Sequence, residues 1–207
     1  MVIHHKNDTT SLDSGALAAL VSRAITLGAT EAAQVAAADI QVDEKYAGFC
    51  FEPRCPHYGQ GGSCPPFVGG PSVFRSWVRE CAGAIVVRLD LPADILFSGQ
   101  RQEIMAFLHE IVSGVERAAR EMGFNRSRAF AGGSCKELFC SAYARCQLLD
   151  SNDGCRNPDT ARPSMSGFGI DVGHLMTLAN LPEKQPGKTT TEEDRSMSWV
   201  AGLVLVG

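Results

Sequence analysis

Two dense groups of cysteine constrain what this chain can fold into. Seven of its eight cysteines fall in two short segments, residues 48–67 and residues 132–158. Glycine and proline recur in both segments, so the chain can bend and bring several thiolates to one centre. A thiolate is a soft ligand that selects zinc, copper(I) or iron–sulfur clusters over harder ions. The sequence therefore predicts metal binding by Cys50, Cys55 and Cys64 of the first segment and by Cys135, Cys140, Cys146 and Cys155 of the second.

The chemical alternative for clustered cysteines is a set of disulfide bonds, and the rest of the chain argues against it. The N-terminal residues contain no apolar run with a small-residue cleavage site, which would mark a secreted protein. The longest apolar runs, residues 82–87 and 199–207, have the length of strands, so no membrane span is expected. We therefore expect a cytoplasmic protein whose cysteines stay reduced.

Length and charge indicate one domain and exclude one class of partner. The 207 residues, 44% of them hydrophobic, suffice for a single metal-binding domain over residues 1–207. Residues 1–10 are expected to be flexible, and residues 181–196, rich in Pro, Thr and charge, to form an exposed loop. The net charge of −4, with Lys and Arg scattered along the chain, gives no basis for nucleic-acid binding. The sequence leaves the oligomeric state open.

Hydrophobic periodicity predicts alternating helices and strands. The expected helices are residues 11–28, 71–81, 98–122 and 170–180, and the expected strands are residues 32–42, 82–91, 127–133 and 199–207. This order predicts an α/β domain in which helices cover a parallel or mixed sheet, with two cysteine-rich metal-binding loops. Each cysteine segment follows a strand, and strand ends in open α/β sheets commonly face the ligand site. We therefore expect the two segments to lie close together.

The second segment supplies enough thiolates for one closed metal centre. Its spacing matches neither the C-x2-C pairs of zinc ribbons nor the run of bacterial ferredoxins. The wider gaps favour a [4Fe–4S] cluster over a single zinc ion. Arg156 and Arg162 follow the last cysteine, and their guanidinium groups would stabilise an anionic cluster. The alternative is that both arginines pair with surface carboxylates such as Asp159.

The first segment supplies only three thiolates, so its fourth ligand is open. His57 is the first candidate, and Cys81, a carboxylate or an outside ligand are the alternatives. Cys81 precedes an expected buried strand, which favours a place in the core over metal binding. Among the other histidines, His109 lies at the edge of the apolar face of its helix and is expected to be solvated.

Several short motifs accompany the cysteines. They are Tyr58-Gly59, Cys64-Pro65-Pro66, Cys155-Arg156-x-Pro158, Arg162-Pro163-Ser164-Met165 and Gly169-Ile170-Asp171-Val172. Their combination resembles a family of bacterial and archaeal cysteine-rich proteins, described as predicted metal-binding proteins and defined by a domain of unknown function. The resemblance spans roughly residues 30–180 and the closing strand. It implies that the same seven cysteines bind metal, and it implies no particular reaction. The chain departs from the family where it has C-x4-C in place of C-x2-C, and where Ser166 replaces an acidic residue.

Three functions are compatible with these features. The leading hypothesis is an iron–sulfur protein with two [4Fe–4S] clusters that passes electrons to a redox partner protein. The second is an iron–sulfur enzyme whose open iron acts on a small anionic substrate. The third is a scaffold in which the cysteines hold structural zinc.

Overall fold

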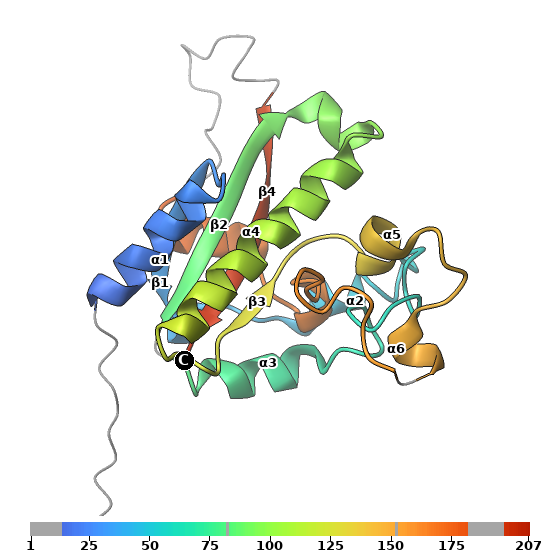
Figure 1. Ribbon diagram of the computed structural model, residues 1–207, viewed down its shortest axis with the longest axis horizontal. Helices are drawn as coiled ribbons and strands as arrows, with labels where there is room; N and C mark the ends of the chain where they lie inside the picture. Colours follow the sequence, from blue (N-terminus) through green and yellow to red (C-terminus); the bar gives the residue numbers. More distant parts are fainter. Residues whose placement is uncertain (1–13, 82, 152, 182–196) are drawn as a thin grey trace, which may run out of the picture.

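A four-stranded antiparallel sheet lies at the centre of the molecule (Figure 1). The computed structural model describes residues 14–81, 83–151, 153–181 and 197–207. The strands are β1 (Glu31–Ala36), β2 (Gly83–Pro92), β3 (Arg128–Phe130) and β4 (Met197–Val206), in the order β1-β2-β4-β3. Because β2 and β4 pair along their whole length, these two strands form the middle of the sheet.

Both faces of the sheet are buried. Along β2, Ala84 and Val86 belong to the hydrophobic core on one face. Ile85, Val87 and Leu89 belong to a second core on the other face. A strand buried on both faces needs apolar residues at nearly every position, which is why β2 and β4 appear in the sequence as continuous apolar runs.

Helices cover both faces and make three layers. On one face lie α1 (Ser14–Thr26) and the long helix α4 (Arg101–Glu121), whose apolar residues enter the second core. On the other lie α3 (Gly70–Val78), the short 3-10 helix η3 (Ser166–Phe168) and α7 (Val172–Leu178). The four predicted helices and four predicted strands have counterparts in the described residues. Most ends differ by a few residues, but the strand predicted over residues 32–42 ends at Ala36 and is followed by the 3-10 helix η1 (Ala37–Asp39).

The prediction of a parallel or mixed sheet is wrong. Within the described residues, each of the three pairings between strands is antiparallel. The segment β2–α4–β3 does return the chain in the same direction, as a strand–helix–strand pattern suggests. However, β4 inserts between β2 and β3, so these two parallel strands never pair with each other. A parallel bridge joins Ala131 to Ser164, outside the sheet strands.

The cysteine segments lie beside the sheet, not within the cores. The short helices α2 (Glu44–Gly48), α5 (Cys135–Cys140) and α6 (Gln147–Asp150) gather at one end of the molecule, on the right of Figure 1. Neither core cluster contains a cysteine of these segments. Two further 3-10 helices, η1 (Ala37–Asp39) and η2 (Ala93–Phe97), follow β1 and β2. Residues 1–10 and, except for residue 181, the expected loop 181–196 lie outside the described residues.

Gly202 tests the packing of the sheet against α4. A Cβ atom at Gly202 would lie 2.5 Å from Cγ1 of Val112 and 3.1 Å from the carbonyl oxygen of Phe130. Val112 is β-branched and helical, so its methyl group has little freedom to move away. We therefore predict that Gly202→Ala lowers the free energy of unfolding by about 1–3 kcal/mol. Chemical unfolding measures the change.

Gly99→Ala is the matched control for this prediction. No atom lies within 4 Å of a Cβ built at Gly99. The added methyl group there should leave the stability unchanged or raise it slightly through the unfolded state. Equal stabilities of the Gly202 and Gly99 variants would contradict the packing argument.

Candidate metal centres

The first cysteine segment follows α2 as a series of tight turns. The backbone N–H of Cys50 donates to the carbonyl of Ala47, and that of Cys55 donates to the carbonyl of Cys50 at 3.1 Å. Further turns end at Tyr58 and Cys64. As a result, Cys50, Cys55 and Cys64 line one cavity of about 360 Å³, which we call the first pocket.

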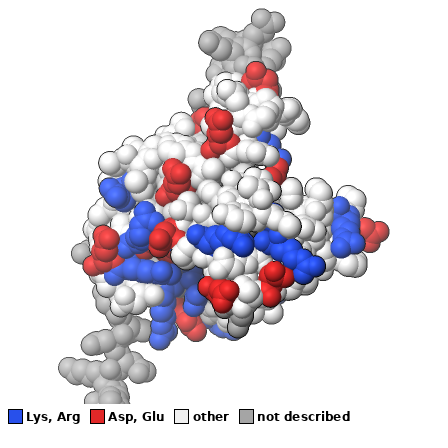
Figure 2. Space-filling model, turned by 45° about the vertical axis from the view of Figure 1, so that its right-hand side comes forward, with Lys and Arg blue, Asp and Glu red and all other residues white. Residues whose placement is uncertain are grey.

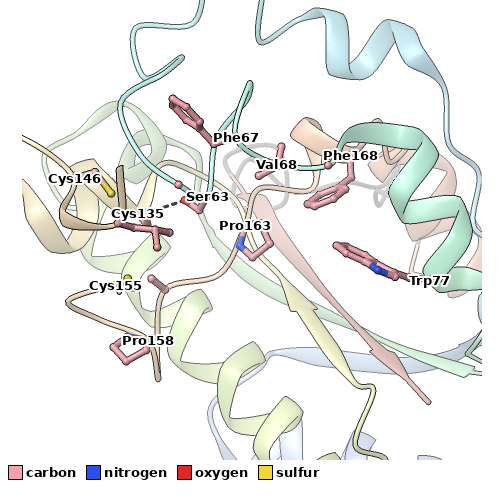
Figure 3. A pocket seen from close by; sticks show the side chains of 14 residues that line it. Ser63, Phe67, Val68, Trp77, Cys135, Cys146, Cys155, Pro158, Pro163 and Phe168 are labelled. Atoms are coloured by element: carbon pink, nitrogen blue, oxygen red, sulfur yellow. Dashed lines mark hydrogen bonds between the residues drawn. The ribbon is translucent and has the colours of Figure 1, made fainter. Parts of the chain in front are cut away.

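The second segment arranges three of its thiols around a separate cavity of about 360 Å³, the second pocket. Cys135, Cys146 and Cys155 lie toward one side of this pocket, and the aromatic side chains of Trp77 and Phe168 lie toward the other (Figure 3). Cys135 begins α5, and Cys146 is the N-cap residue of α6, so short helices position both thiols. The lining is mostly apolar, so it offers water few hydrogen-bond partners.

Cys140 lies outside both pocket linings, yet a hydrogen-bonded residue links it to the second pocket. The side-chain amide of Asn157 donates to the sulfur of Cys140 at 3.3 Å. The backbone N–H of Asn157 donates to the sulfur of Cys155 at 3.3 Å. Asn157 therefore holds two of the predicted ligands of the second segment near each other.

The two segments meet through residues 163–165, which follow the second segment. Ala131 donates its N–H to the carbonyl of Pro163 and accepts the N–H of Met165, both at 3.0 Å. On the other side, the N–H of Ser164 donates to the carbonyl of Ser63 at 3.3 Å. Residues 163–165 thus hold the first segment against the beginning of the second.

The two segments do not come together through neighbouring strand ends, as the sequence suggested. The sequence predicts that the segments lie close together because each follows a strand, and strand ends in open α/β sheets commonly face the ligand site. The pairings make β1 and β3 antiparallel to each other, so their ends point in opposite directions. The first segment instead returns past η3 and α7, where Val42 forms an antiparallel bridge with Ile170.

A repeated tetrapeptide forms the contact between the pockets. The sequence Gly-Gly-Ser-Cys occurs at residues 61–64 and again at residues 132–135. The hydroxyl of Ser63 donates to the sulfur of Cys135 at 2.7 Å, and the sulfur of Cys64 lies 3.6 Å from the hydroxyl of Ser134. We call these two contacts the serine–cysteine junction. Sequence reasoning missed both serines, although the repetition itself was a visible signal.

Burial keeps several of these thiols in the neutral form. It raises the pKa of the Cys135 thiol to about 11, even though the hydrogen bond from Ser63 acts in the opposite direction. Burial also raises the pKa values of Cys50 and Cys64, and the nearby thiol of Cys55 adds to both shifts. A metal that binds these sulfurs must therefore displace protons.

His57 lies in the first pocket beside a carboxylate. Its Nε2 atom is 2.9 Å from Oε2 of Glu137, and the amide of Gln102 donates to the other carboxylate oxygen at 3.2 Å. A histidine that binds metal usually donates its second ring N–H to such a partner, which fixes the ring. His57 therefore has the surroundings of a metal ligand, with Nδ1 as the atom left to bind.

Arg162 is a buried structural residue. Its guanidinium group forms an ion pair with the buried carboxylate of Glu116, with Nη2 2.6 Å from Oε2. The same group donates to the carbonyl oxygens of Pro158, Asp159 and Ala161. It lines neither pocket, and it pairs with the backbone of Asp159 instead of its carboxylate. Its donors hold the chain after Cys155 in place.

Arg156 contacts the loop that precedes Cys146 in the second segment. Its guanidinium carbon lies 4.1 Å from the centre of the Tyr143 ring, and Nη1 donates to the carbonyl of Arg145 at 3.2 Å. These contacts join the loop before Cys146 to the residue after Cys155. Arg156 lines neither pocket.

The expectation that His109 is solvated is wrong, because its side chain is 0% exposed. Nδ1 accepts the backbone N–H of Arg162 at 3.0 Å, and Nε2 lies 3.0 Å from the carbonyl of Gly132. The chain after the second cysteine segment covers this side of α4, which helical periodicity could not reveal. Ser113 and Glu116 are buried on the same helix. Polar residues at positions 109, 113 and 116 share one side of a helix, and that spacing was the available signal.

Cys81 belongs to neither of the two cysteine segments. It is 8% exposed in the hydrophobic core on the α3 side of the sheet. A Cβ at the C-terminal residue Gly207 would lie 2.8 Å from its sulfur, which places the thiol at the end of β4. In the part of the chain that the structure describes, no three His, Cys, Asp or Glu side chains are already grouped to hold a single metal ion.

A model of the family of predicted metal-binding proteins (DUF2284) matches residues 33–206. The chain belongs to this family. No curated protein and no solved structure gives a significant match. Among the described residues, no helix combines the length and hydropathy of a membrane span.

The motifs that suggested the family frame the metal-binding end of the molecule. Gly169 has a φ of +73°, and a Cβ there would lie 2.6 Å from the carbonyl oxygen of Asp43. Asp171 accepts the N–H of His174 at the start of α7 and the hydroxyl of Tyr46 at 2.7 Å. Asp171 therefore joins α2 to α7, and Gly169 allows the close approach of the chain before α2.

His109 should make stability depend on pH. Its burial lowers the pKa to about 4, and the unfolded chain should titrate near the ordinary value of 6.5. Between these values the unfolded state binds more protons, so stability is full above pH 6.5 and falls as the pH drops toward 4. From pH 7 to pH 5 we expect His109 to account for a loss of about 2 kcal/mol.

Denaturant unfolding of the reduced, metal-free protein at pH 7 and pH 5 measures this dependence. Metal must be absent because acid also displaces metals from thiolates. His109→Asn removes the titrating group and should reduce the pH-dependent loss by that amount, whatever its effect at pH 7. The same loss in both proteins would rule out His109 as the source.

Proposed function

We propose that this chain is an iron–sulfur protein that binds two [4Fe–4S] clusters and passes electrons to a partner enzyme. The observation that carries the proposal is the pair of adjacent pockets, each lined by three cysteines and joined by the serine–cysteine junction. One centre alone would need only one such pocket. Two centres close together in one domain suit a short path for electrons.

The donor set fits these clusters. Cys50, Cys55 and Cys64, with His57 as the fourth ligand, would hold one, and the four cysteines of the second segment would hold the other. The clusters would supply one-electron chemistry. The chain contributes thiol ligands, hydrogen bonds to sulfur from Ser63 and Asn157, and a mostly apolar lining around the second centre. These are the factors that set the potential of such a centre.

The surface around the segments supports a protein partner. Six of the eleven large apolar side chains that are exposed in the described residues belong to the two cysteine segments. They are Phe49, Phe51, Phe67, Tyr143, Leu148 and Leu149. Basic and acidic side chains are interspersed on the face drawn in Figure 2, so this face has no large region of a single charge. An apolar surface with mixed charge around it suits transient docking of a protein.

All eight cysteines are free thiols in the structure. We place the protein in the cytoplasm as part of this proposal, because a reducing compartment keeps thiols available for metal.

An enzyme is the second candidate, and the first pocket favours it. Unlike the second pocket, this cavity has a polar wall, made by Arg101, Ser134, Glu137, Ser164 and Ser166. A small molecule bound there would lie beside the three-cysteine centre. Arg101, not Arg156 or Arg162, is the arginine that such a molecule would meet.

We predict that protein purified without oxygen contains about eight iron and eight sulfide per chain. Cys140→Ser should lower both to about four, because the second centre loses one of its ligands. Metal and sulfide analysis with an absorption spectrum measures this. Zinc without sulfide would refute the iron–sulfur proposal. If added cyanide changes the electron paramagnetic resonance signal of one reduced centre, that centre has an exchangeable position and the enzyme candidate replaces the carrier.

The fourth ligand of the first centre is tested by a pair of substitutions. We predict that His57→Ala lowers the iron bound at the first centre, because Nδ1 is lost from the pocket. Cys81→Ala should keep both centres, since its thiol lies in the core. Iron content is compared in the two variants. Loss of a centre in the Cys81 variant, with none in the His57 variant, would reverse the assignment.

A further inference from the structure

The serine–cysteine junction crosses between the two centres. Ser63 precedes Cys64 of the first segment but donates to Cys135 of the second at 2.7 Å. Ser134 precedes Cys135 of the second segment but its hydroxyl lies 3.6 Å from the sulfur of Cys64. Each Gly-Gly-Ser-Cys turn therefore carries a ligand for its own centre and a hydroxyl that contacts a ligand of the other. The Ser63 hydroxyl also opposes the rise in the pKa of Cys64 beside it, so Ser63 acts on a ligand of each centre.

We propose that Ser63 and Ser134 are positioning residues for the opposite metal centre, and that they couple the properties of the two centres. The proposal rests on the proposed function, in that it assumes a metal centre at each pocket. Ser63 then stabilises the centre of the second segment, and Ser134 stabilises the centre of the first.

The backbone fixes both hydroxyls. Ser134 is 1% exposed, so its hydroxyl has no access to bulk water. The carbonyl of Ser63 accepts the N–H of Ser164, which anchors its turn to residues 163–165. A Cβ at Gly61 would lie 3.5 Å from the sulfur of Cys135 and 3.3 Å from Cβ of Lys136. The turns therefore approach so closely that the cross-contacts follow from the backbone positions.

Binding of metal strengthens both contacts. A metal-bound cysteine is a thiolate with no proton of its own, so it can only accept hydrogen bonds. The hydroxyl of Ser134 then turns to donate to Cys64, as that of Ser63 already donates to Cys135. A hydrogen bond to a charged acceptor is stronger than one between neutral groups. Ligation at one centre therefore engages a hydroxyl that belongs to the turn of the other.

Hydrogen bonds to ligand sulfur also affect reduction. Reduction adds negative charge to a cluster and its thiolates, and a hydroxyl that donates to a thiolate stabilises that charge. Removing the hydroxyl should therefore move the potential to a more negative value. It should also speed the release of metal, because the thiolate loses a partner that held it in place.

The test compares Ser63→Ala and Ser134→Ala in the full chain, with Ser141→Ala as the matched control. Ser141 follows Cys140 and is exposed, and none of the hydrogen bonds found among the described residues joins it to a cysteine sulfur. Cys50→Ser and Cys155→Ser identify the signals of the first and second centres. The measurements are the rate of metal release from each centre to a chelator and, for iron–sulfur centres, the midpoint potential of each.

We expect Ser63→Ala to speed metal release from the second centre and to make its potential more negative. Ser134→Ala should do the same to the first centre. Ser63→Thr keeps the hydroxyl and should restore the wild-type values, and the Ser141 variant should match the wild type. If the second centre of the Ser63 variant releases metal at the wild-type rate, the inference is wrong.

Failure of the proposed function can be distinguished from failure of this inference. If the chain contains zinc in place of iron, the electron-transfer proposal fails. The rates of zinc release from the two centres still test whether each serine stabilises the centre of the opposite segment. If Ser134→Ala does not fold, the more exposed Ser63 carries the test alone.

Discussion

The buried ion pair between Arg162 and Glu116 joins the chain that follows the second cysteine segment to α4. Glu116 sits on α4, the longest helix, and also accepts the backbone N–H of Ala129 in β3 at 3.1 Å. Arg162 comes directly before residues 163–165, which bind both Ala131 and Ser63. A buried ion pair adds little net stability over apolar packing, but breaking it is costly. Here the ion pair connects α4 to residues 163–165, which contact both cysteine segments.

The sequence could predict the elements better than their arrangement. The apolar residues of α4 repeat at helical spacing, and those of β2 and β4 form unbroken runs, so local patterns alone predict them. The order of the sheet depends on which strands pair across more than a hundred residues. β4 is the last element of the chain, yet it separates β2 from β3. No local pattern carries that information, and the alternation of helices and strands therefore wrongly predicted a parallel or mixed sheet.

In the candidate site too, some residues could be predicted from the sequence and others could not. Cysteine is scarce enough that seven in two segments were informative without a structure, whereas serine, histidine and glutamate are common on surfaces. His109 lies on a helix whose polar side would ordinarily face water, and residues more than fifty positions later cover it. Ser63 and Ser134 differ from other serines only through the segment opposite each of them. Whether a polar side chain is buried depends on the tertiary structure. In the sequence, the spacing of residues 109, 113 and 116 on α4 was the one signal for the buried side of that helix, and the repeated tetrapeptide was the one signal for the two serines.

The separation of the cores from the cysteine segments has a thermodynamic consequence. The seven cysteines belong to neither hydrophobic core, so the free energy that holds the sheet and its helices does not require a metal. Without metal, the raised pKa of Cys135 keeps that thiol neutral, and a neutral thiol is far cheaper to bury than a thiolate. The segments can therefore pack against the rest of the molecule before a metal binds, with Cys135 buried as a neutral thiol. A metal that binds these thiols exchanges their protons for a cation, and it adds to a sheet and helices whose cores form without it.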